Sequence, residues 1–393
     1  MKRNLLLILL ILFLIKYLTF CGEEELIAPA VTKKTNISDD PKATSLPVIQ
    51  STILKILSPD KVDVVYNITD DGGAKIISHG ICWDTCVFPY NPNQTILYGG
   101  WDNRTHQSLV LDGLNPGTKY YLRAFAMNNL GTAYGNEVSF TTPALVTPAD
   151  VFNPGLQYGS VTDIDGNTYK TIQIGTQTWM AENLKTTRYN NGSQVPNVTR
   201  WDEWLALKTA AYKWYRDKSN IYKNSFGAFY NHYAVNTGNL CPAGWHVPTD
   251  MEWQKLEISL GMTSIEASAC NSTNFYLEDS EYLGSRGVNQ GYQLKATKGW
   301  FDVNVLAGEG WDIKTVIGAG DNSSGFSALP AGVYFVESAH NGGYSGGFLR
   351  SGRFAAWWCS GDPIARALYS EESGISSAHC DELAGFSVRC LKN

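Results

Sequence analysis

Residues 240–253 read Leu240-Cys241-Pro242-Ala243-Gly244-Trp245-His246-Val247-Pro248-Thr249-Asp250-Met251-Glu252-Trp253, and their local signals agree with one another. Thr249 and Glu252 have the spacing of a capping box, in which each side chain satisfies a backbone N–H at the start of a helix. Pro248 keeps the residue before it extended, so the helix is expected to begin sharply after it. The residues that recur at helical spacing and would form its apolar face are Trp253, Leu256 and Leu260.

Cys241 lies just before this predicted helix, and we expect it to form a disulfide with a distant strand. Our first candidate partner is Cys390, in the segment Gly385-Phe386-Ser387-Val388-Arg389-Cys390 close to the last residue. A disulfide between these two cysteines would close most of the second half of the chain into one domain.

Together, the helix segment and the Gly-Phe-Ser-Val-Arg-Cys segment resemble the Fibrobacter succinogenes major paralogous domain, which is common in surface proteins of Bacteroidetes and Fibrobacteres. The resemblance runs from about Gly159 to Cys390. Further segments that carry it are Ile174–Leu184, Tyr230-Asn231, Tyr233–Asn236, Gly325–Gly332 and Trp357-Trp358.

More distantly, the Pro-Thr-x-x-Glu-Trp helix and the ending are similar to the formylglycine-generating and sulfatase-modifying family. That resemblance implies an α+β, C-type-lectin-like fold for the second half. The relatives oxidise cysteine with a reactive cysteine pair close together near the chain end. Cys359 has no partner five residues on, and Cys380 and Cys390 are ten apart, so we do not expect that activity here.

Composition favours rigid β-rich domains. A chain of 393 residues is long enough for two or three domains. Charged residues make up only 17%, while aromatic residues reach 12%, which argues against disorder. The net charge is −6 and no run of Lys or Arg exceeds a pair, so the basic footprint of a nucleic-acid-binding protein is missing.

The first 20 residues read as a signal peptide. Lys2-Arg3 is a positive start, and the apolar run Leu5–Ile15 is too short to span a bilayer comfortably. Cys21, followed by Gly22 and an acidic run, resembles the lipidation site of a surface-exported bacterial lipoprotein. Phe20 and Lys16 depart from that pattern, and cleavage near Ala28 or an uncleaved anchor are the alternatives. We expect an outer-membrane lipoprotein exposed at the cell surface, attached to the membrane only through its lipid.

Seven cysteines follow Cys21, and an exported protein can oxidise them. Sequence alone does not fix their connectivity. After Cys241–Cys390, our second candidate pair is Cys359–Cys380, and Cys82–Cys86 could pair within one turn. Cys270 would then be left as a buried or loop thiol.

The domain order follows from changes in pattern. Residues 21–44 are expected to form a lipid-anchored linker, and 45–143 show short alternating strands at sandwich spacing. This segment resembles a fibronectin type III domain, with Tyr120 as a tyrosine corner, and we treat it as a spacer. Residues 144–158 are expected to be a second linker, and 159–393 the C-type-lectin-like domain.

No convincing catalytic constellation is visible. Gly343–Gly347 matches the string G-x-S-x-G of a nucleophile elbow, but that chemistry needs a strand before it and a helix after it. Here a Gly-rich loop between strands is expected, so we interpret the string as structural. We therefore expect a protein that is not an enzyme. No cofactor is expected, although calcium could be held by loop acids, which are more often simply solvated. Those acids are Asp302, Asp312 and Asp321.

Recognition is the function that remains. Exposed Trp and Tyr side chains present flat apolar faces with a polar edge, and they anchor sugar and protein contacts. The sequence predicts non-catalytic binding or adhesion to a glycan or a surface protein. The alternatives are an accessory or enzymatic part of a glycan-degrading system, or a structural envelope protein. The candidate ligand-binding residues are Trp300, Trp311, Tyr344 and Trp358.

Overall fold

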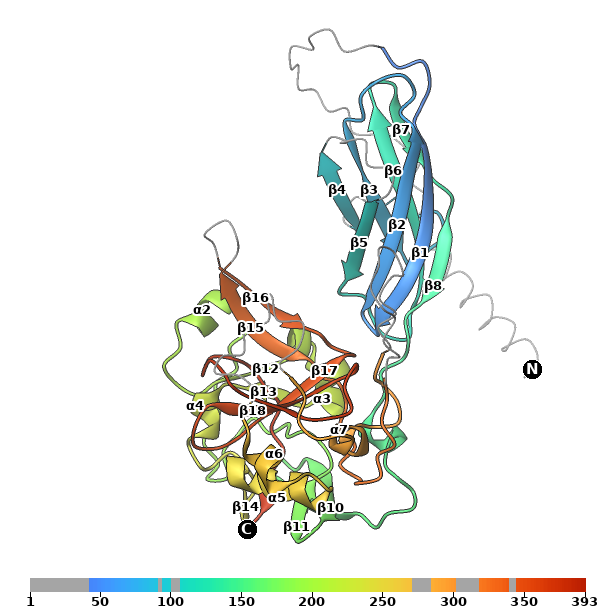
Figure 1. The fold of residues 1–393 in the computed structure, drawn as a ribbon. Helices are drawn as coiled ribbons and strands as arrows, with labels where there is room; N and C mark the ends of the chain where they lie inside the picture. Colours follow the sequence, from blue (N-terminus) through green and yellow to red (C-terminus); the bar gives the residue numbers. More distant parts are fainter. Residues whose placement is uncertain (1–41, 91–93, 100–106, 271–283, 302–317, 339–343) are drawn as a thin grey trace, which may run out of the picture. The chain divides into compact units, whose positions relative to one another are not determined.

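The computed structural model describes residues 42–90, 94–99, 107–270, 284–301, 318–338 and 344–393, which form two compact units (Figure 1). Unit 1 comprises the described residues up to Ile56 together with Lys61–Thr142, and unit 2 comprises Leu57–Asp60 and Pro143–Asn393. Strands dominate both units, so the predicted β-rich, multidomain architecture is confirmed. Within the described ranges, no helix has the length and apolar character needed to cross a bilayer.

Unit 1 is built from two antiparallel sheets around one core. One sheet has the order β1-β2-β5, and the other has the order β4-β3-β6-β7 with β8 also paired to β6. Val62 and Val64 alternate with less buried neighbours along β2, as predicted, and pack with Leu122 from the other sheet. The Tyr120 hydroxyl accepts a hydrogen bond from the backbone N–H of Asn115 at 2.9 Å, so the predicted tyrosine corner is formed. The strands are β1 Val48–Ser58, β2 Lys61–Asp70, β3 Ser78–Asp84, β4 Thr95–Gly99, β5 Gln107–Asp112, β6 Lys119–Asn128, β7 Gly131–Tyr134 and β8 Val138–Thr141.

Unit 2 combines several small sheets with short helices. Its largest sheet has the order β14-β20-β11-β10-β9. Two two-stranded sheets, β12-β13 and β15-β16, and a three-stranded sheet, β17-β18-β19, complete the unit. The strands are β9 Gly159–Thr162, β10 Thr168–Ile174, β11 Gln177–Met180, β12 Tyr212–Trp214, β13 Ala228–Tyr230, β14 Trp245–His246, β15 Val333–Ser338, β16 Tyr344–Leu349, β17 Phe354–Trp358, β18 Ile364–Tyr369, β19 Ser376–His379 and β20 Leu391–Lys392. The helices are η1 Pro148–Asp150, α2 Trp201–Leu205, η2 Tyr215–Asp217, α3 Ser219–Phe226, α4 His232–Val235, α5 Asp250–Ser259, α6 Ser264–Ser268 and α7 Gln290–Leu294.

The helix predicted after Thr249 is α5. Its capping box is complete, because Thr249 accepts from the Glu252 N–H and Glu252 accepts from the Thr249 N–H. Trp253 and Leu256 are buried, and the Trp253 ring lies 4.8 Å from that of Trp179 on β11. The apolar face of this helix therefore packs on the largest sheet, as the sequence spacing predicted.

The Cys241–Cys390 disulfide is formed and joins segments that are 149 residues apart. The second predicted pair is wrong, because Cys359 and Cys380 both carry free thiols. The N–H of Cys359 bonds to Ile364 and that of Cys380 to Pro363, so the start of β18 lies between the two cysteines. Neighbouring strands are about 4.8 Å apart, so two residues on either side of β18 are separated by roughly twice that distance. This separation is larger than the Cα–Cα distance that a disulfide can bridge.

The predicted Cys82–Cys86 pair is also wrong. Cys82 has a free, buried thiol in strand β3, where its Sγ contacts the carbonyl of Pro89 at 3.0 Å. Cys86 lies in the turn that follows this strand, so the two side chains have different surroundings. Cys270, predicted to be left over as a buried or loop thiol, is exposed just after α6.

Two further segments differ from expectation. The predicted linker 144–158 contains η1 and packs on unit 2, because Val146 and Val151 form a small cluster with Ala296 and Leu329. The G-x-S-x-G string lies partly in strand β16, whose Ser345 is paired with Glu337 of β15. The predicted Gly-rich loop is therefore a strand here, and the strand–turn–helix of a nucleophile elbow is not formed at this position.

Candidate binding site

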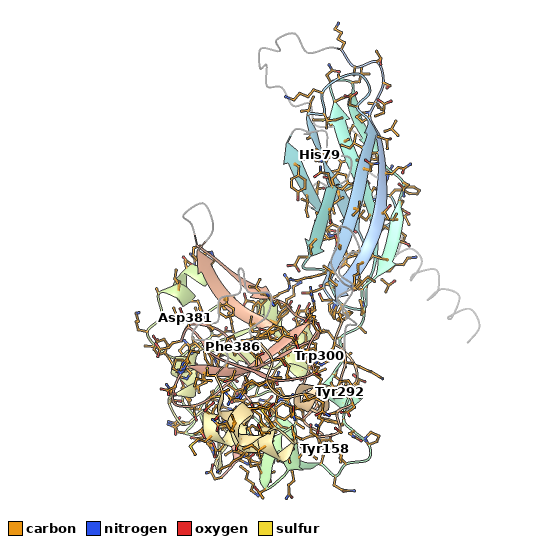
Figure 2. All side chains as sticks on the ribbon, viewed as in Figure 1. His79, Tyr158, Tyr292, Trp300, Asp381 and Phe386 are labelled. Atoms are coloured by element: carbon orange, nitrogen blue, oxygen red, sulfur yellow. A yellow bond between two sulfur atoms is a disulfide. The ribbon has the colours of Figure 1, made fainter. Side chains whose placement is uncertain are left out.

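Two of the predicted aromatic ligand residues are buried. Trp300, labelled in Figure 2, is 7% exposed. Trp358 is fully buried, so both predictions are wrong. The indole N–H of Trp300 donates to the Ala328 carbonyl at 2.9 Å, and that of Trp358 donates to Tyr230 at 2.8 Å. Gly299 precedes Trp300 and favoured a loop position, but the Trp300 ring packs in the core. Tyr344 is the first residue of β16, and Trp311 lies outside the described residues.

Of the three predicted calcium ligands, the structure describes Asp321 alone. Asp302 and Asp312 lie outside the described residues. Asp321 is exposed, and its Oδ1 accepts the N–H of Ser323 at 2.9 Å, which caps a turn. In the described part of the chain, no group of three His, Cys, Asp or Glu side chains has the arrangement of a metal site.

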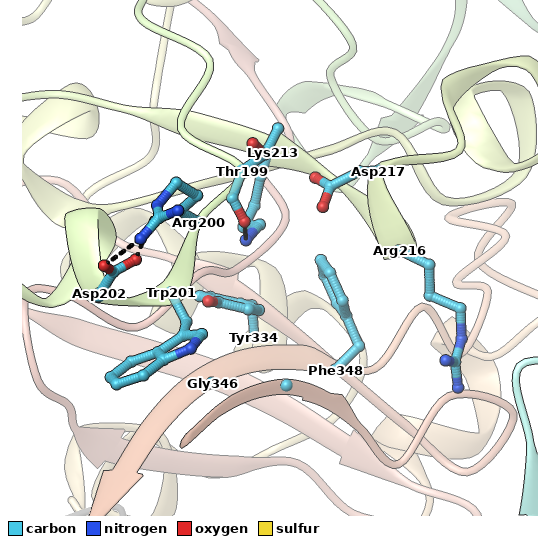
Figure 3. A pocket seen from close by; sticks show the side chains of 11 residues that line it. Thr199, Arg200, Trp201, Asp202, Lys213, Arg216, Asp217, Tyr334, Gly346 and Phe348 are labelled. Carbon is cyan, nitrogen blue, oxygen red and sulfur yellow. Dashed lines mark hydrogen bonds and ion pairs between the residues drawn. The ribbon is translucent and has the colours of Figure 1, made fainter. Parts of the chain in front are cut away.

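A cavity of about 480 Å³ lies elsewhere in unit 2 (Figure 3). Polar side chains and aromatic rings both line it, which is the usual composition of a ligand site. We call it the Trp201 pocket. Its lining residues are Thr199, Arg200, Trp201, Asp202, Lys213, Arg216, Asp217, Tyr334, Gly346, Gly347 and Phe348.

The short helix α2 holds Trp201 at the rim of the pocket. Trp204, one turn further on, is fully buried, and its indole N–H donates to the Leu383 carbonyl at 2.6 Å. Asp202 and Glu203 occupy the first turn, where acidic side chains stabilise the positive end of a helix. With the helix anchored in this way, the Trp201 side chain remains 40% exposed. An exposed indole at a cavity is a surface on which an apolar ligand face can stack.

Lys213 contributes a buried ammonium group to the pocket. It lies on β12 between two buried aromatic residues, and its Nζ donates to the Thr199 carbonyl at 2.8 Å. The same Nζ lies 3.9 Å from the centre of the Tyr334 ring, a cation–π contact. Burial lowers the pKa of Lys213, while the nearby Asp217 carboxylate acts in the opposite direction.

The backbone at Arg216 and Asp217 is strained. Both residues have positive φ angles, 51° and 55°, which cost energy for residues other than glycine. The Arg216 guanidinium pairs with the buried Asp60 carboxylate at 2.6 Å, and the Tyr215 hydroxyl donates to that same carboxylate at 2.9 Å. These contacts hold the strained turn in place. Strain of this kind gathers at functional sites, and here it sets the position of Asp217 on the pocket wall.

Tyr334 supplies a hydroxyl group without a partner. The residue is 2% exposed, and its Oη makes no hydrogen bond within the described structure. A Cβ added at Gly346 would lie 2.5 Å from this Oη, so glycine is needed opposite the hydroxyl. Burial, together with the nearby Asp217 charge, raises the pKa of Tyr334 to about 12. The hydroxyl therefore stays protonated at neutral pH and can donate a hydrogen bond.

The sequence did not single out these residues. It showed a Trp- and Tyr-rich region from Trp201 to Tyr233, and α2, β12 and η2 lie in that region. The other wall comes from β15 and β16, more than 100 residues later. The aromatic-rich region was an available signal, but its pairing with Tyr334 is a product of the tertiary fold.

Comparison with known proteins places the pocket within one domain. Residues 172–392 match the Fibrobacter succinogenes major domain, and this range includes all the lining residues. No curated protein matches the chain.

Two solved structures share limited similarity with the chain. The sensor domain of the anti-sigma factor RsgI4 of Pseudobacteroides cellulosolvens is 15% identical over 26% of this chain and 100% of its own, with a TM-score of 0.21. The fourth FNIII domain of a human protein is 20% identical over 32% of this chain and 93% of its own, with a TM-score of 0.21. At these TM-scores, neither similarity supports a conclusion about this chain.

Proposed function

The chain belongs to the Fibrobacter succinogenes major domain family, and we propose that it is a non-catalytic module that binds a glycan in the Trp201 pocket. The observation that carries this proposal is Tyr334, a residue of the pocket wall whose buried hydroxyl has no partner among the described residues. A buried polar group without a partner costs about 1–3 kcal/mol. The hydroxyl is enclosed beside Gly346 and Trp201, so a ligand hydroxyl would reach Oη once the Trp201 side chain shifts, and that hydrogen bond would remove the cost.

A sugar fits the remaining features of the pocket. The apolar C–H face of a pyranose ring stacks on an exposed indole such as Trp201, and its hydroxyls both donate and accept hydrogen bonds. Lys213 offers donors and Asp217 offers acceptors within the same cavity. Gly347 allows a ligand to approach the backbone of β16 closely, because nothing lies within 4 Å of a Cβ added there.

The cellular setting is part of the same proposal. The protein is exported, lipidated at Cys21 and held at the outer-membrane surface, and a fibronectin type III-like spacer carries the binding unit. Unit 2 is an α+β, C-type-lectin-like domain, a distant relative of the formylglycine-generating family without its activity. The resemblances described in the sequence analysis support this setting.

The test is retention of the purified full chain, disulfide intact, on a panel of immobilised plant and host polysaccharides, with calcium and with a chelator. We expect retention by at least one polysaccharide in both conditions, since no acid cluster lines the pocket. Trp201→Ala should weaken it at least about tenfold, the usual cost of removing a central aromatic contact. The control is Met251→Ala, which removes a 68% exposed side chain on α5 and should change nothing.

Three outcomes would contradict the proposal. Absence of retention on every polysaccharide would shift the function to a protein partner or a structural role in the envelope. Retention that Trp201→Ala leaves unchanged would place the glycan site elsewhere. Loss of retention with the chelator would instead favour the predicted loop acids.

A further inference from the structure

The arginine residues of the pocket are already paired. Arg200 donates to Asp202 at 2.5 Å and also lies 3.3 Å from Glu203. Arg216 is held by the buried Asp60, and Figure 3 shows its guanidinium directed away from the other lining residues. Neither guanidinium is therefore free to form the two-pronged contact with which arginine recognises a carboxylate or a phosphate.

The inner charges of the pocket are one ammonium and one carboxylate. Lys213 has three N–H donors, and among the described residues only the Thr199 carbonyl accepts one of them. The Asp217 carboxylate accepts no hydrogen bond, and no ion pair joins it to Lys213 in the part of the molecule that the structure describes. The two groups still influence each other electrostatically. Both side chains line the same cavity, so a ligand atom can lie between them.

Hydroxyl groups on adjacent carbons suit such a pair. One hydroxyl oxygen can accept from the Lys213 ammonium while its neighbour donates to the Asp217 carboxylate. Figure 3 shows Lys213 and Asp217 on one side of the pocket and the rings of Trp201, Tyr334 and Phe348 on the other. A pyranose ring presents the same division, with hydroxyls at its edge and an apolar face.

We propose that Lys213 and Asp217 bind a pair of adjacent hydroxyls on a neutral sugar, and that the pocket excludes acidic sugars. This inference rests on the proposed glycan-binding function. The sum of the inner charges is zero. A uronate carboxylate would find no free guanidinium, and beside the Lys213 ammonium it would also face the Asp217 carboxylate. A like charge placed against the wrong ligand is one of the ways in which a site becomes specific.

The experiment compares the full chain with its Asp217→Asn variant on neutral glucan, mannan and galactan and on polygalacturonate. Asparagine keeps the shape of the side chain and tolerates the positive φ of this position, so the variant is expected to fold. The wild type should bind at least one neutral polysaccharide and not polygalacturonate. Asp217→Asn should weaken the neutral binding by about tenfold, the effect of losing a hydrogen bond to a charged group.

The control is Asp362→Asn, which neutralises an exposed carboxylate outside the pocket and should have no effect. Unchanged binding by Asp217→Asn, with loss of binding by Trp201→Ala, would overturn this inference and leave the glycan-binding proposal intact. Wild-type binding to polygalacturonate that tightens in Asp217→Asn would overturn the exclusion of acidic sugars. Failure of the wild type on every polysaccharide would instead count against glycan binding itself.

Discussion

The side-chain oxygen of Asn183 lies 2.9 Å from Nε of Arg389 and joins two residues that are 206 positions apart. The Arg389 guanidinium is fully buried, and burial lowers its pKa to about 9. Its other nitrogens donate to the carbonyls of Phe326 and Ser327, and no carboxylate pairs with it among the described residues. The sequence segments that identify the family therefore build the core, while the Trp201 pocket uses other residues.

Replacing Asn183 should destabilise the protein strongly. Its oxygen also accepts from the Trp357 indole at 2.9 Å, and its amide donates to the Phe226 carbonyl and to Ser387. In Asn183→Ala these buried groups lose their partner, and we expect a loss of about 3 kcal/mol in the free energy of unfolding. Urea denaturation measures it. Asn239→Ala, at an exposed position, is the control, and an equal stability of the two variants would contradict this account.

The Cys241–Cys390 disulfide should contribute about 3–5 kcal/mol, because it closes a loop of 149 residues in the unfolded chain. The double variant Cys241→Ser with Cys390→Ser is expected to unfold at a correspondingly lower denaturant concentration. Cys270→Ser, which changes an exposed cysteine outside this disulfide, should behave like the wild type. If reduction of the wild type left its midpoint unchanged, the disulfide would not have this role.

Much of the fold could be predicted because its signals are local. The capping box at Thr249 and the alternation of Val62 and Val64 act within a few residues, and both elements form as expected. The wrong cysteine pairs show the limit of this reasoning. Cys359 and Cys380 are close in sequence, but the start of β18 lies between them, and strand order is a long-range property.

The Tyr334→Phe variant should change the free energy of unfolding and the affinity for glycan in different ways. Removing a buried hydroxyl without a partner is expected to leave the free energy of unfolding unchanged or to raise it by up to about 1 kcal/mol. The same change should weaken glycan binding, because the ligand loses a hydrogen bond. Tyr169→Phe is the matched comparison, since the Tyr169 hydroxyl donates to Asp163 at 2.6 Å and accepts from the Lys185 N–H at 3.0 Å. That variant should be destabilised, and a destabilised Tyr334→Phe would show that its hydroxyl does have a structural partner.

Glycan binding should weaken as the pH falls. Burial raises the pKa of Asp217 above the usual value of about 4, and Lys213 on β12 opposes part of the rise. The other charged or titratable groups nearby are Tyr334 on β15 and Arg216 on η2. The carboxylate is ionised above its raised pKa, so its acceptors are complete at neutral pH and are lost as the pH falls through that pKa.

Affinity measured from pH 7.5 downward checks this prediction. Loss of binding should begin at a higher pH than an ordinary aspartate would give, and Asp217→Asn should lack this step. An identical pH profile in wild type and variant would show that another group is responsible.

The pocket could not be predicted from sequence for physical reasons. The positive φ angles at Arg216 and Asp217 depend on the distant Asp60, which holds the turn. The unpartnered Tyr334 hydroxyl is recognised only when its surroundings are known. Trp300 and Trp358 appeared better placed for binding, yet both are core residues. The sequence alone does not show whether an aromatic residue packs in the core or binds a ligand.

The most direct test is a crystal structure of the full chain with an oligosaccharide taken from a polysaccharide that retains it. The account predicts a pyranose ring stacked on Trp201, with one hydroxyl within hydrogen-bond distance of Tyr334 Oη and two more on Lys213 and Asp217. A sugar bound at another surface, with the Trp201 pocket holding only solvent, would contradict it.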